Sequence, residues 1–407
     1  MGKVKRLICV EVGGSTKQSN KFYNMTEVPG DSFEVEYGRV GKTKIKKSYP
    51  MRDWDKILRS KLKKYDDITH LHETEEIEIS SSLNVDDPDV KKFIEILQGF
   101  STAHVKSNYS VSASKVTQAM IDRAQKILNQ LPSFLVKKDK AEINKNLLEL
   151  YKTIPREMKD VTKNLIQSLQ DREDKKTARK MFESEQETLD TMASQVKIQT
   201  ASQVVEIDDT PFLESLGLEI VPATDTEIKE VRDLMYGANR NFHRMFKVIN
   251  KSTEGLYQDD LAKCKGKSRT EQLFFHGSRN QNWMSILMNG LLIRPSGAIH
   301  TGSMFGDGIY GANKARKALG YCSLSGSYWA KGSGNVGYMG VYSFRVGKQK
   351  NIKNHNSSCY TLNKSKLKND GFDSVYAHGG ADLRNDEFIV YDNAQTTIRY
   401  IIELKPE

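Results

Sequence analysis

Three short stretches near the carboxyl end carry side chains that could do chemistry. His276 directly follows a short apolar run, and Tyr310 stands among glycines. Glu387 directly precedes another apolar run. Taken alone, each has an ordinary structural explanation, because polar residues at strand ends are usually satisfied or solvated. Together they supply an imidazole, an aromatic ring that can stack on a cation, and a carboxylate that can polarise a hydroxyl.

The charge around these residues favours an anionic ligand. Between Glu271 and Asp370 the only acidic residue is Asp307, against 13 lysines and arginines. Such a stretch attracts or tolerates phosphates, so a nucleotide or a nucleic acid is favoured. Glycines spell G-x-G-x-x-G at 306–311 and again at 332–337. That dinucleotide fingerprint needs an acidic residue about 20 positions later, which neither stretch has, so we exclude a site of this kind.

The part of the chain that must position these side chains is predicted to have an α+β fold. Several apolar runs are separated by loops rather than by long helices, which favours a mainly antiparallel sheet. Strands are expected at 273–275, 340–346, 374–376, 388–391 and 398–404. In the same part of the chain, Thr224 and Glu227 form a capping-box pattern that predicts the start of a helix.

The preceding part of the chain divides into a basic unit and a helical region. Residues 1–65 hold 16 Lys and Arg against 7 Asp and Glu, which fits either a solvated lysine-rich surface or a nucleic-acid-binding face. Alternation predicts a strand at 32–37, and helical spacing predicts a helix from Trp54. Apolar stripes from 86 to about 203 predict helices. One is opened by Asp87, one is capped by Ser114, and a third ends before Pro155.

Composition sets broad limits on the class of protein. The 407 residues suggest two to four domains, and the formal charge is 62 − 52 = +10. No apolar run approaches the roughly 20 residues that span a bilayer, so no membrane partner is expected. The four cysteines form no C-x-x-C pair and the histidines no H-E-x-x-H spacing. We therefore expect no metal and a reducing compartment.

The last part of the sequence resembles the catalytic domain of the poly(ADP-ribose) polymerases. The matching stretches are LFFHGSRNQNWMSILMNGL, TGSMFGDGIYGA and NDEFIVYDNAQTTIRYIIEL. Upstream, the region containing LLELYKTIPR resembles the family's helical regulatory domain, and YGRVG at 37–41 resembles the signature of a WGR domain.

The resemblance implies a multi-domain α+β protein of the short, DNA-dependent type. Its expected parts are a WGR-like nucleic-acid-binding domain at 1–72, with a small β-sheet and one helix, a linker at 73–85, an all-α regulatory bundle at 86–203, and a mainly antiparallel ADP-ribosyltransferase domain at 204–407.

The resemblance also implies a function. The chain is expected to be an NAD+-dependent poly(ADP-ribose) polymerase activated by DNA breaks, with NAD+ as co-substrate, nicotinamide as product and no metal. The implied partners are DNA with broken, 5′-phosphorylated ends and protein acceptors, the protein itself included. A monomer is expected, in the nucleus of a eukaryotic host and otherwise in the cytoplasm. Two alternatives stay open: a mono-ADP-ribosyltransferase with the same site, and a catalytically weak scaffold that binds DNA ends.

The resemblance also implies which residues form the sites, because they stand at matching positions of the family's motifs. The residues expected to act in catalysis are Glu387, Tyr310 and His276. Those expected to bind NAD+ are His276, Gly277, Ser278, Ser285, Arg294, Gly308, Tyr310, Lys317 and Tyr321. Those expected to bind DNA are Tyr37, Gly38, Arg39, Lys42 and Lys44.

The sequence departs from the family pattern at a few of these positions. Tyr37 stands where the WGR signature has tryptophan, which leaves a smaller surface for stacking on a DNA end. Leu292 stands where the family often has an arginine near the adenine, and Arg294 could substitute for it. Ser285 and Ala318 replace a glycine and a serine that the family often has beside the nucleotide.

Overall fold

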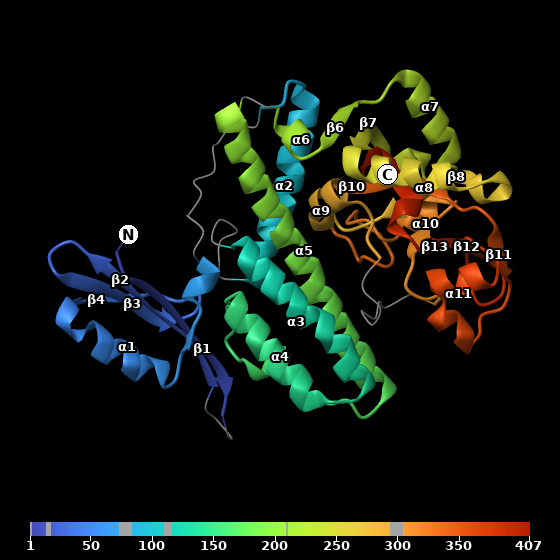
Figure 1. The fold of residues 1–407 in the computed structure, drawn as a ribbon. Coiled ribbons are helices and arrows are strands. Elements are labelled where there is room, and N and C mark those ends of the chain that lie inside the picture. Colours follow the sequence, from blue (N-terminus) through green and yellow to red (C-terminus); the bar gives the residue numbers. More distant parts are fainter. Residues whose placement is uncertain (1, 14–17, 73–83, 110–115, 209–210, 294–303) are drawn as a thin grey trace. The chain divides into compact units, whose positions relative to one another are not determined.

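The computed structural model describes residues 2–13, 18–72, 84–109, 116–208, 211–293 and 304–407, which form two compact units (Figure 1). The first unit comprises Met1–Ile79 and Thr102–Val196, and the second comprises Ser80–Ser101 and Lys197–Glu407. Both combine helices with antiparallel sheets, which confirms the expected α+β class. The finer division at 72, 85 and 203 rests on resemblance and stays a prediction.

The first unit begins with a five-stranded antiparallel sheet in the order β4-β3-β2-β1-β5. A tight turn at Gly30 and Asp31, both with positive φ, joins the second strand to the third. One face of the sheet is covered by the helix α1, whose Trp54 meets Phe33 edge-on at 5.0 Å between ring centroids. The elements are β1 (Val4–Val12), β2 (Gln18–Val28), β3 (Ser32–Arg39), β4 (Ile45–Pro50), α1 (Trp54–Leu62) and β5 (Asp66–Asp67).

Helices form the rest of the first unit. They are α3 (Gln118–Val136), α4 (Lys140–Thr153), the end of α2 (Pro88–Asn108) and most of α5 (Arg172–Asp208). The expectation that Ser114 caps the second helix is wrong. The cap of α3 is Thr117, whose side chain accepts a hydrogen bond from the Met120 amide, and Ser114 lies outside the described residues. Most of the expected linker, 73–83, also lies outside them.

The second unit contains a five-stranded antiparallel sheet in the order β6-β7-β14-β10-β8. Its strand β10, which lies between β14 and β8, is buried along its whole length, which explains its mostly apolar sequence. The strands are β6 (Leu218–Pro222), β7 (Phe242–Asn250), β8 (Glu271–Gly277), β10 (Gly337–Arg345) and β14 (Thr396–Leu404).

A smaller sheet in the order β11-β12-β13-β9 lies beside it. A bridge between Phe275 and Ala312 joins the two sheets through hydrogen bonds of 2.8 and 3.0 Å. The ring of Phe274 stacks on Phe388, with 4.4 Å between centroids. The strands are β9 (Ile309–Gly311), β11 (Gln349–Ile352), β12 (Ser374–Ala377) and β13 (Glu387–Val390). The helices of this unit are α6 (Phe212–Ser215), α7 (Asp225–Leu234), α8 (Lys251–Lys263), α9 (Trp283–Asn289), α10 (Ala315–Leu319) and α11 (Lys364–Asn369).

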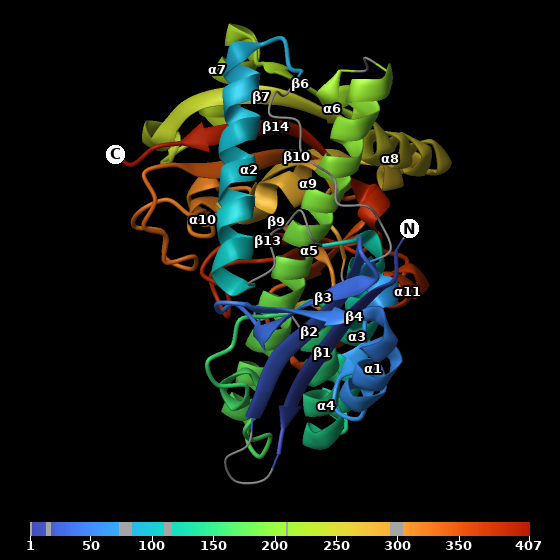
Figure 2. The same ribbon diagram turned by 90° about the vertical axis from the view of Figure 1, so that its left-hand side faces the viewer.

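The amino-terminal part of α2 belongs to the core of the second unit. It crosses the face of the five-stranded sheet (Figure 2). Phe93 is fully buried there, and it stacks on Phe246 at 4.7 Å and meets Tyr338 edge-on at 5.5 Å. Removing this helix would therefore uncover part of the sheet.

Most of the expected elements of the second unit are present. The expected strands correspond to β8, β10, β12, β13 and β14, and the capping box of Thr224 and Glu227 is formed at the start of α7. Within the part of the chain that the structure describes, no helix is long and apolar enough to cross a membrane.

Candidate active site

His276 lies near the end of β8, where the larger sheet is joined to the smaller one. Its Nδ1 is 3.3 Å from the backbone oxygen of Tyr310, which can only accept a hydrogen bond. Nδ1 is therefore assigned the proton, and Nε2 is left as an acceptor. Burial lowers the pKa of His276, so the ring stays neutral at physiological pH. Among the described residues, no partner of Nε2 is found.

Gly277 ends β8 against the short helix α10. A Cβ on this residue would lie 2.8 Å from the carbonyl carbon of Ala318 and closer still to its oxygen. Only glycine allows the strand and the helix to approach in this way. The close approach sets the position of α10, which carries Lys317, relative to the strand that carries His276.

Tyr310 is fixed in β9 by bonds at both its backbone and its hydroxyl. It pairs with Ile389 of β13. Its hydroxyl donates to the backbone oxygen of Gly306 at 2.9 Å and accepts from the amide of Phe305 at 3.1 Å. Burial raises the pKa of this hydroxyl, with a smaller contribution from the carboxylate of Glu387. The ring is consequently neutral and held in one orientation.

Glu387 begins β13 and forms an ion pair with Lys317. The Lys317 ammonium is 2.7 Å from the Glu387 carboxylate and 3.0 Å from the backbone oxygen of Asp386. The side chains of Lys317 and Glu387 are only 14% and 15% exposed, so the pair is weakly screened by water. Burial lowers the pKa of Lys317, and the Glu387 carboxylate opposes that shift. The lysine therefore fixes the carboxylate in one position.

The side chain of Asp386 holds the backbone beside the Lys317–Glu387 pair in place. Asp386 was not predicted as a site residue from the sequence. Its carboxylate accepts hydrogen bonds from the Gly379 amide at 2.8 Å, the Tyr376 hydroxyl at 3.2 Å and the Asn313 amide at 3.4 Å. These bonds hold the backbone whose carbonyl meets Lys317. Its place directly before Glu387 in the quoted motif was the available signal.

Two further side chains lie beside the end of β8. Ser278 accepts a hydrogen bond from the Asn282 side-chain amide at 3.2 Å. The other amide atom of Asn282, Oδ1, is buried and has no hydrogen-bond partner among the residues that the structure describes, which is costly unless a ligand supplies a donor. Nε2 of His276 is a second acceptor that is left open among the described residues. Asn282 lies within the first quoted motif but was not predicted as a site residue.

Tyr321 follows α10 and is 41% exposed. Burial of its hydroxyl raises its pKa, and the carboxylate of Glu387 adds to the rise. Glu387 thus acts electrostatically on the hydroxyls of both Tyr310 and Tyr321.

The structure brings most of the predicted NAD+-binding residues together. They are His276, Gly277, Ser278, Gly308, Tyr310, Lys317 and Tyr321, and they lie with Glu387, which was predicted to act in catalysis. Ser285 lies further along, on α9, where its hydroxyl accepts from Asn289 at 3.3 Å. Arg294 lies outside the described residues.

The predicted DNA-binding residues lie in the first unit, at the end of β3 and in the following turn. Two of them contact the segment that follows α4. The Arg39 guanidinium donates to the backbone oxygens of Met158 at 3.3 Å and Lys159 at 2.8 Å, and Lys42 pairs with Glu157 at 2.6 Å. Exposed pairs such as the last are weak and salt-sensitive.

The other predicted DNA-binding residues have neighbours within the sheet. Lys44 pairs with Glu36 at 3.2 Å. The ring of Tyr37 lies 5.6 Å from that of Tyr23, and Gly38 precedes the turn.

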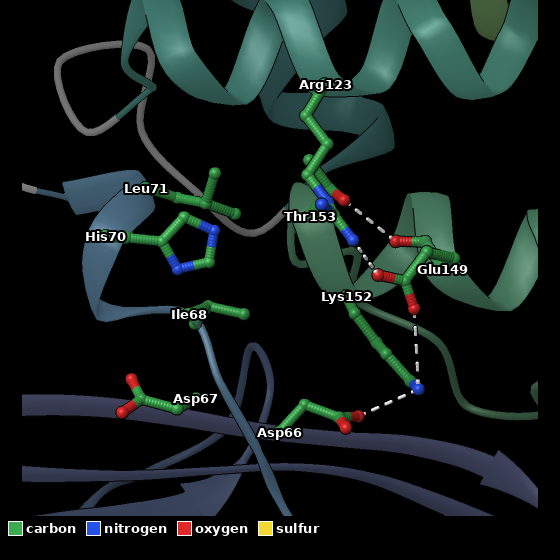
Figure 3. A pocket seen from close by; sticks show the side chains of 9 residues that line it. All are labelled: Asp66, Asp67, Ile68, His70, Leu71, Arg123, Glu149, Lys152 and Thr153. Atoms are coloured by element: carbon green, nitrogen blue, oxygen red, sulfur yellow. Dashed lines mark hydrogen bonds and ion pairs between the residues drawn. The ribbon is translucent and has the colours of Figure 1, made fainter.

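The first unit also contains a cavity of about 220 Å³ (Figure 3). Lys152 links Asp66, at 2.8 Å, to Glu149, at 3.6 Å, and Arg123 also reaches Glu149. Asp67 pairs with Lys5 at 2.7 Å, outside the lining, and none of the lining residues belongs to the predicted sites. The lining residues are Asp66, Asp67, Ile68, His70, Leu71, Arg123, Glu149, Lys152 and Thr153. No group of three or more metal-ligating side chains gathers anywhere in the described ranges.

Comparison with known proteins agrees with the geometry of the second unit. Residues 225–406 match the family described as the poly(ADP-ribose) polymerase catalytic domain. An uncharacterized protein, 101L, of Invertebrate iridescent virus 6 is 33% identical over 192 residues, which are 47% of this chain and 78% of that protein. The putative poly [ADP-ribose] polymerase-like 100L of the same virus is 28% identical, over 44% of this chain and 93% of that protein.

A third relative extends the similarity beyond this unit. Poly [ADP-ribose] polymerase 2 of Arabidopsis thaliana is 21% identical over 471 aligned positions, which cover 95% of this chain and 71% of that protein.

Proposed function

Since the chain belongs to the poly(ADP-ribose) polymerase family and is an NAD+ ADP-ribosyltransferase, we propose that it builds poly(ADP-ribose) in response to broken DNA. The acceptors are proteins, the protein itself included. The observation that carries the proposal is the ion pair between Lys317 and Glu387, which holds a carboxylate at the start of β13, the strand that pairs with Tyr310.

The chemistry requires little more than charge and position. NAD+ supplies a cationic pyridinium that leaves as neutral nicotinamide, so no general acid is needed, and the barrier is the positive charge that develops on the ribose. Glu387 stabilises that charge and polarises the incoming hydroxyl, as carboxylates do in glycoside hydrolysis. Lys317 holds the Glu387 carboxylate in place through their ion pair. Tyr310 and Tyr321 offer aromatic faces to the pyridinium, where a cation–π contact is worth about 0.5–2 kcal/mol.

Polar atoms near the end of β8 bind the ribose on the adenosine side of NAD+. The neutral His276 accepts a hydrogen bond from one hydroxyl at Nε2, and Asn282 Oδ1 accepts one from a second hydroxyl. Gly277 presents its backbone to the carboxamide of nicotinamide, and the Ser278 hydroxyl adds a bond there.

Transfer is tested with labelled NAD+ and two matched variants. Glu387→Gln keeps the shape of the side chain but removes its charge, so it should abolish polymer while NAD+ still binds. The control is Glu219→Gln, the same change at an exposed position on β6. Glu219→Gln should form polymer at the parent rate. Polymer formed at the parent rate by Glu387→Gln would reject the assignment.

Polymer and single transfer differ in the mobility of the modified protein on a gel. We propose elongation because Glu387 can polarise the hydroxyl of a previous ADP-ribose unit as readily as that of a protein. A smear of slow species is expected. A discrete shift would mean that the chain transfers one unit, and no nicotinamide release at all would favour a DNA-end-binding scaffold.

Activation by DNA is proposed from the first unit. The turn that follows β3 carries Arg39 and Lys42, and the similarity to the Arabidopsis poly [ADP-ribose] polymerase 2 covers 95% of this chain. DNA phosphates would compete with Glu157 for Lys42, because both are anions that can pair with the exposed ammonium. Such a role places the protein in the nucleus of a eukaryotic host.

The test of activation compares nicotinamide release with and without a nicked duplex that bears a 5′ phosphate. We expect a large rise with the duplex, and less of a rise at high salt because exposed charges are screened. Equal rates with and without DNA would contradict this part of the proposal.

A further inference from the structure

The segment after α10 folds back onto its own start. The amides of Trp329 and Ala330 both donate to the backbone oxygen of Gly320, at 2.8 and 2.9 Å. Further along, Ser325 donates to the oxygen of Gly334 at 2.8 Å. These bonds hold the loop against the residue that precedes Tyr321.

Trp329 lies parallel to Tyr321. Their ring centroids are 6.1 Å apart and their planes differ by 18°. Tyr328 meets Trp329 edge-on at 4.7 Å. A Cβ on Gly320 would lie 3.1 Å from Cδ1 of Trp329, so the absence of a side chain at Gly320 permits the close approach. The indole is therefore held in place although it is 61% exposed.

Tyr321 itself is tied to the candidate active site. The next residue, Cys322, is buried, and its thiol donates to the backbone oxygen of Tyr338 at 3.0 Å. The ring of Tyr321 stays 41% exposed, and it follows by four residues Lys317, whose ammonium pairs with Glu387. A tyrosine exposed to this degree keeps rotamer freedom unless a neighbouring ring restricts it.

We propose that Trp329 is a positioning residue for the nicotinamide end of NAD+. It holds Tyr321 parallel to the pyridinium and extends the electron-rich surface on which that cation lies. This rests on the proposed function, because it takes Tyr321 as the ring that stacks on nicotinamide. An indole is the ring that attracts cations most strongly, so the pair binds the pyridinium better than Tyr321 alone.

Fluorescence tests the proximity without turnover. Of the three tryptophans in the chain, Trp54 and Trp283 are 4% and 0% exposed. Trp329 is the exposed one, so a ring stacked close to it should quench its emission. NAD+ titrated into the wild-type protein should give saturable quenching, and Trp329→Phe should lose it. Unchanged quenching in Trp329→Phe, or none in the wild type at saturating NAD+, would overturn the inference.

Kinetics separate positioning from a merely structural role. Trp329→Ala should raise KM for NAD+ about twofold to tenfold without lowering kcat, since the lost contact is made to the cationic pyridinium of the bound substrate and weakens as nicotinamide becomes neutral. Trp329→Phe should restore KM, because a ring remains beside Tyr321. The control is Tyr236→Ala, which removes an aromatic ring that is 90% exposed in the same unit. Equal KM values in Trp329→Ala and Tyr236→Ala would overturn the inference.

The two proposals fail in different ways. If nicotinamide is released at the same rate and KM by every Trp329 variant, the inference fails and the proposed function stands. If Trp329 fluorescence is quenched by NAD+ but no nicotinamide is released, the inference stands and the proposed function fails.

Discussion

Replacement of Gly277 by alanine tests how strictly the end of β8 sets the position of α10. The added Cβ would lie 2.8 Å from the carbonyl carbon of Ala318 and closer to its oxygen. Because a carbon–oxygen contact needs about 3.3 Å, the strand and the helix must separate by on the order of 1 Å. The displacement would move Lys317, and with it the carboxylate of Glu387.

A misplacement of about 1 Å costs roughly a hundredfold in rate, and overpacking costs about 1–3 kcal/mol of stability. We therefore expect Gly277→Ala to fold, with a lowered free energy of unfolding, and to lose about a hundredfold in kcat/KM. The assay is nicotinamide release, measured together with denaturant unfolding so that loss of fold is not mistaken for loss of rate.

Gly255→Ala is the matched control. Gly255 lies inside α8, and a Cβ there would meet nothing within 4 Å. Alanine at this position should stabilise the helix by about 0.5–1 kcal/mol and leave kcat/KM unchanged. A folded Gly277→Ala variant whose kcat/KM matches that of Gly255→Ala would refute the reasoning.

Three other changes should have distinct effects. Burial holds the pKa of His276 below 6.5, so kcat/KM should be constant above pH 6.5 and should fall only as the pH drops through the lowered pKa. The pH–rate profile of His276→Asn should lack this fall at acid pH. Asp386→Ala frees the backbone that meets Lys317 and should lower kcat about tenfold, whereas Asp386→Asn should keep most of the rate. Equal kcat values of these two variants in steady-state assays would show that Asp386 does not position the pair. Phe93→Ala should destabilise the second unit by about 3–5 kcal/mol in denaturant unfolding, because the ring is buried on Phe246; an unchanged midpoint would mean that α2 contributes little to this core.

Five strands of the second unit, β8, β10, β12, β13 and β14, were predictable because each contains a compact apolar run, whereas β6, β7, β9 and β11 were not predicted. Phe388 and its neighbours in β13 are apolar and directly follow a charged residue, so both the strand and the place of Glu387 at its start could be expected. The same holds for the capping box of α7, since Thr224 and Glu227 have the required spacing. These signals are local in sequence.

Other features depend on contacts between distant residues. The pair of Lys317 and Glu387 spans 70 positions, and no spacing rule foretells it. The length of α5, 37 residues, was missed because its sequence is mostly polar and its apolar stripe is weak. Trp329 stands in a glycine- and serine-rich loop that reads as irregular, and only the folded chain brings it beside Tyr321.

The sequence also could not show that the helical region is shared between the two units. The apolar positions of α2 predict a buried face but not the surface against which it packs. In the structure, Phe93 is part of the core of the second unit. Deleting the whole of 86–203 would therefore uncover Phe246 and Tyr338, which a shorter deletion beginning after Ser101 would avoid.

The most direct test of the central claim is an experimental structure of the protein with an unreactive NAD+ analogue. We predict that the Glu387 carboxylate lies within hydrogen-bond distance of the nicotinamide ribose while still paired with Lys317, and that the pyridinium lies against the rings of Tyr310 and Tyr321. An analogue bound with its nicotinamide ribose beyond the reach of Glu387, even through a bridging water, would contradict the account.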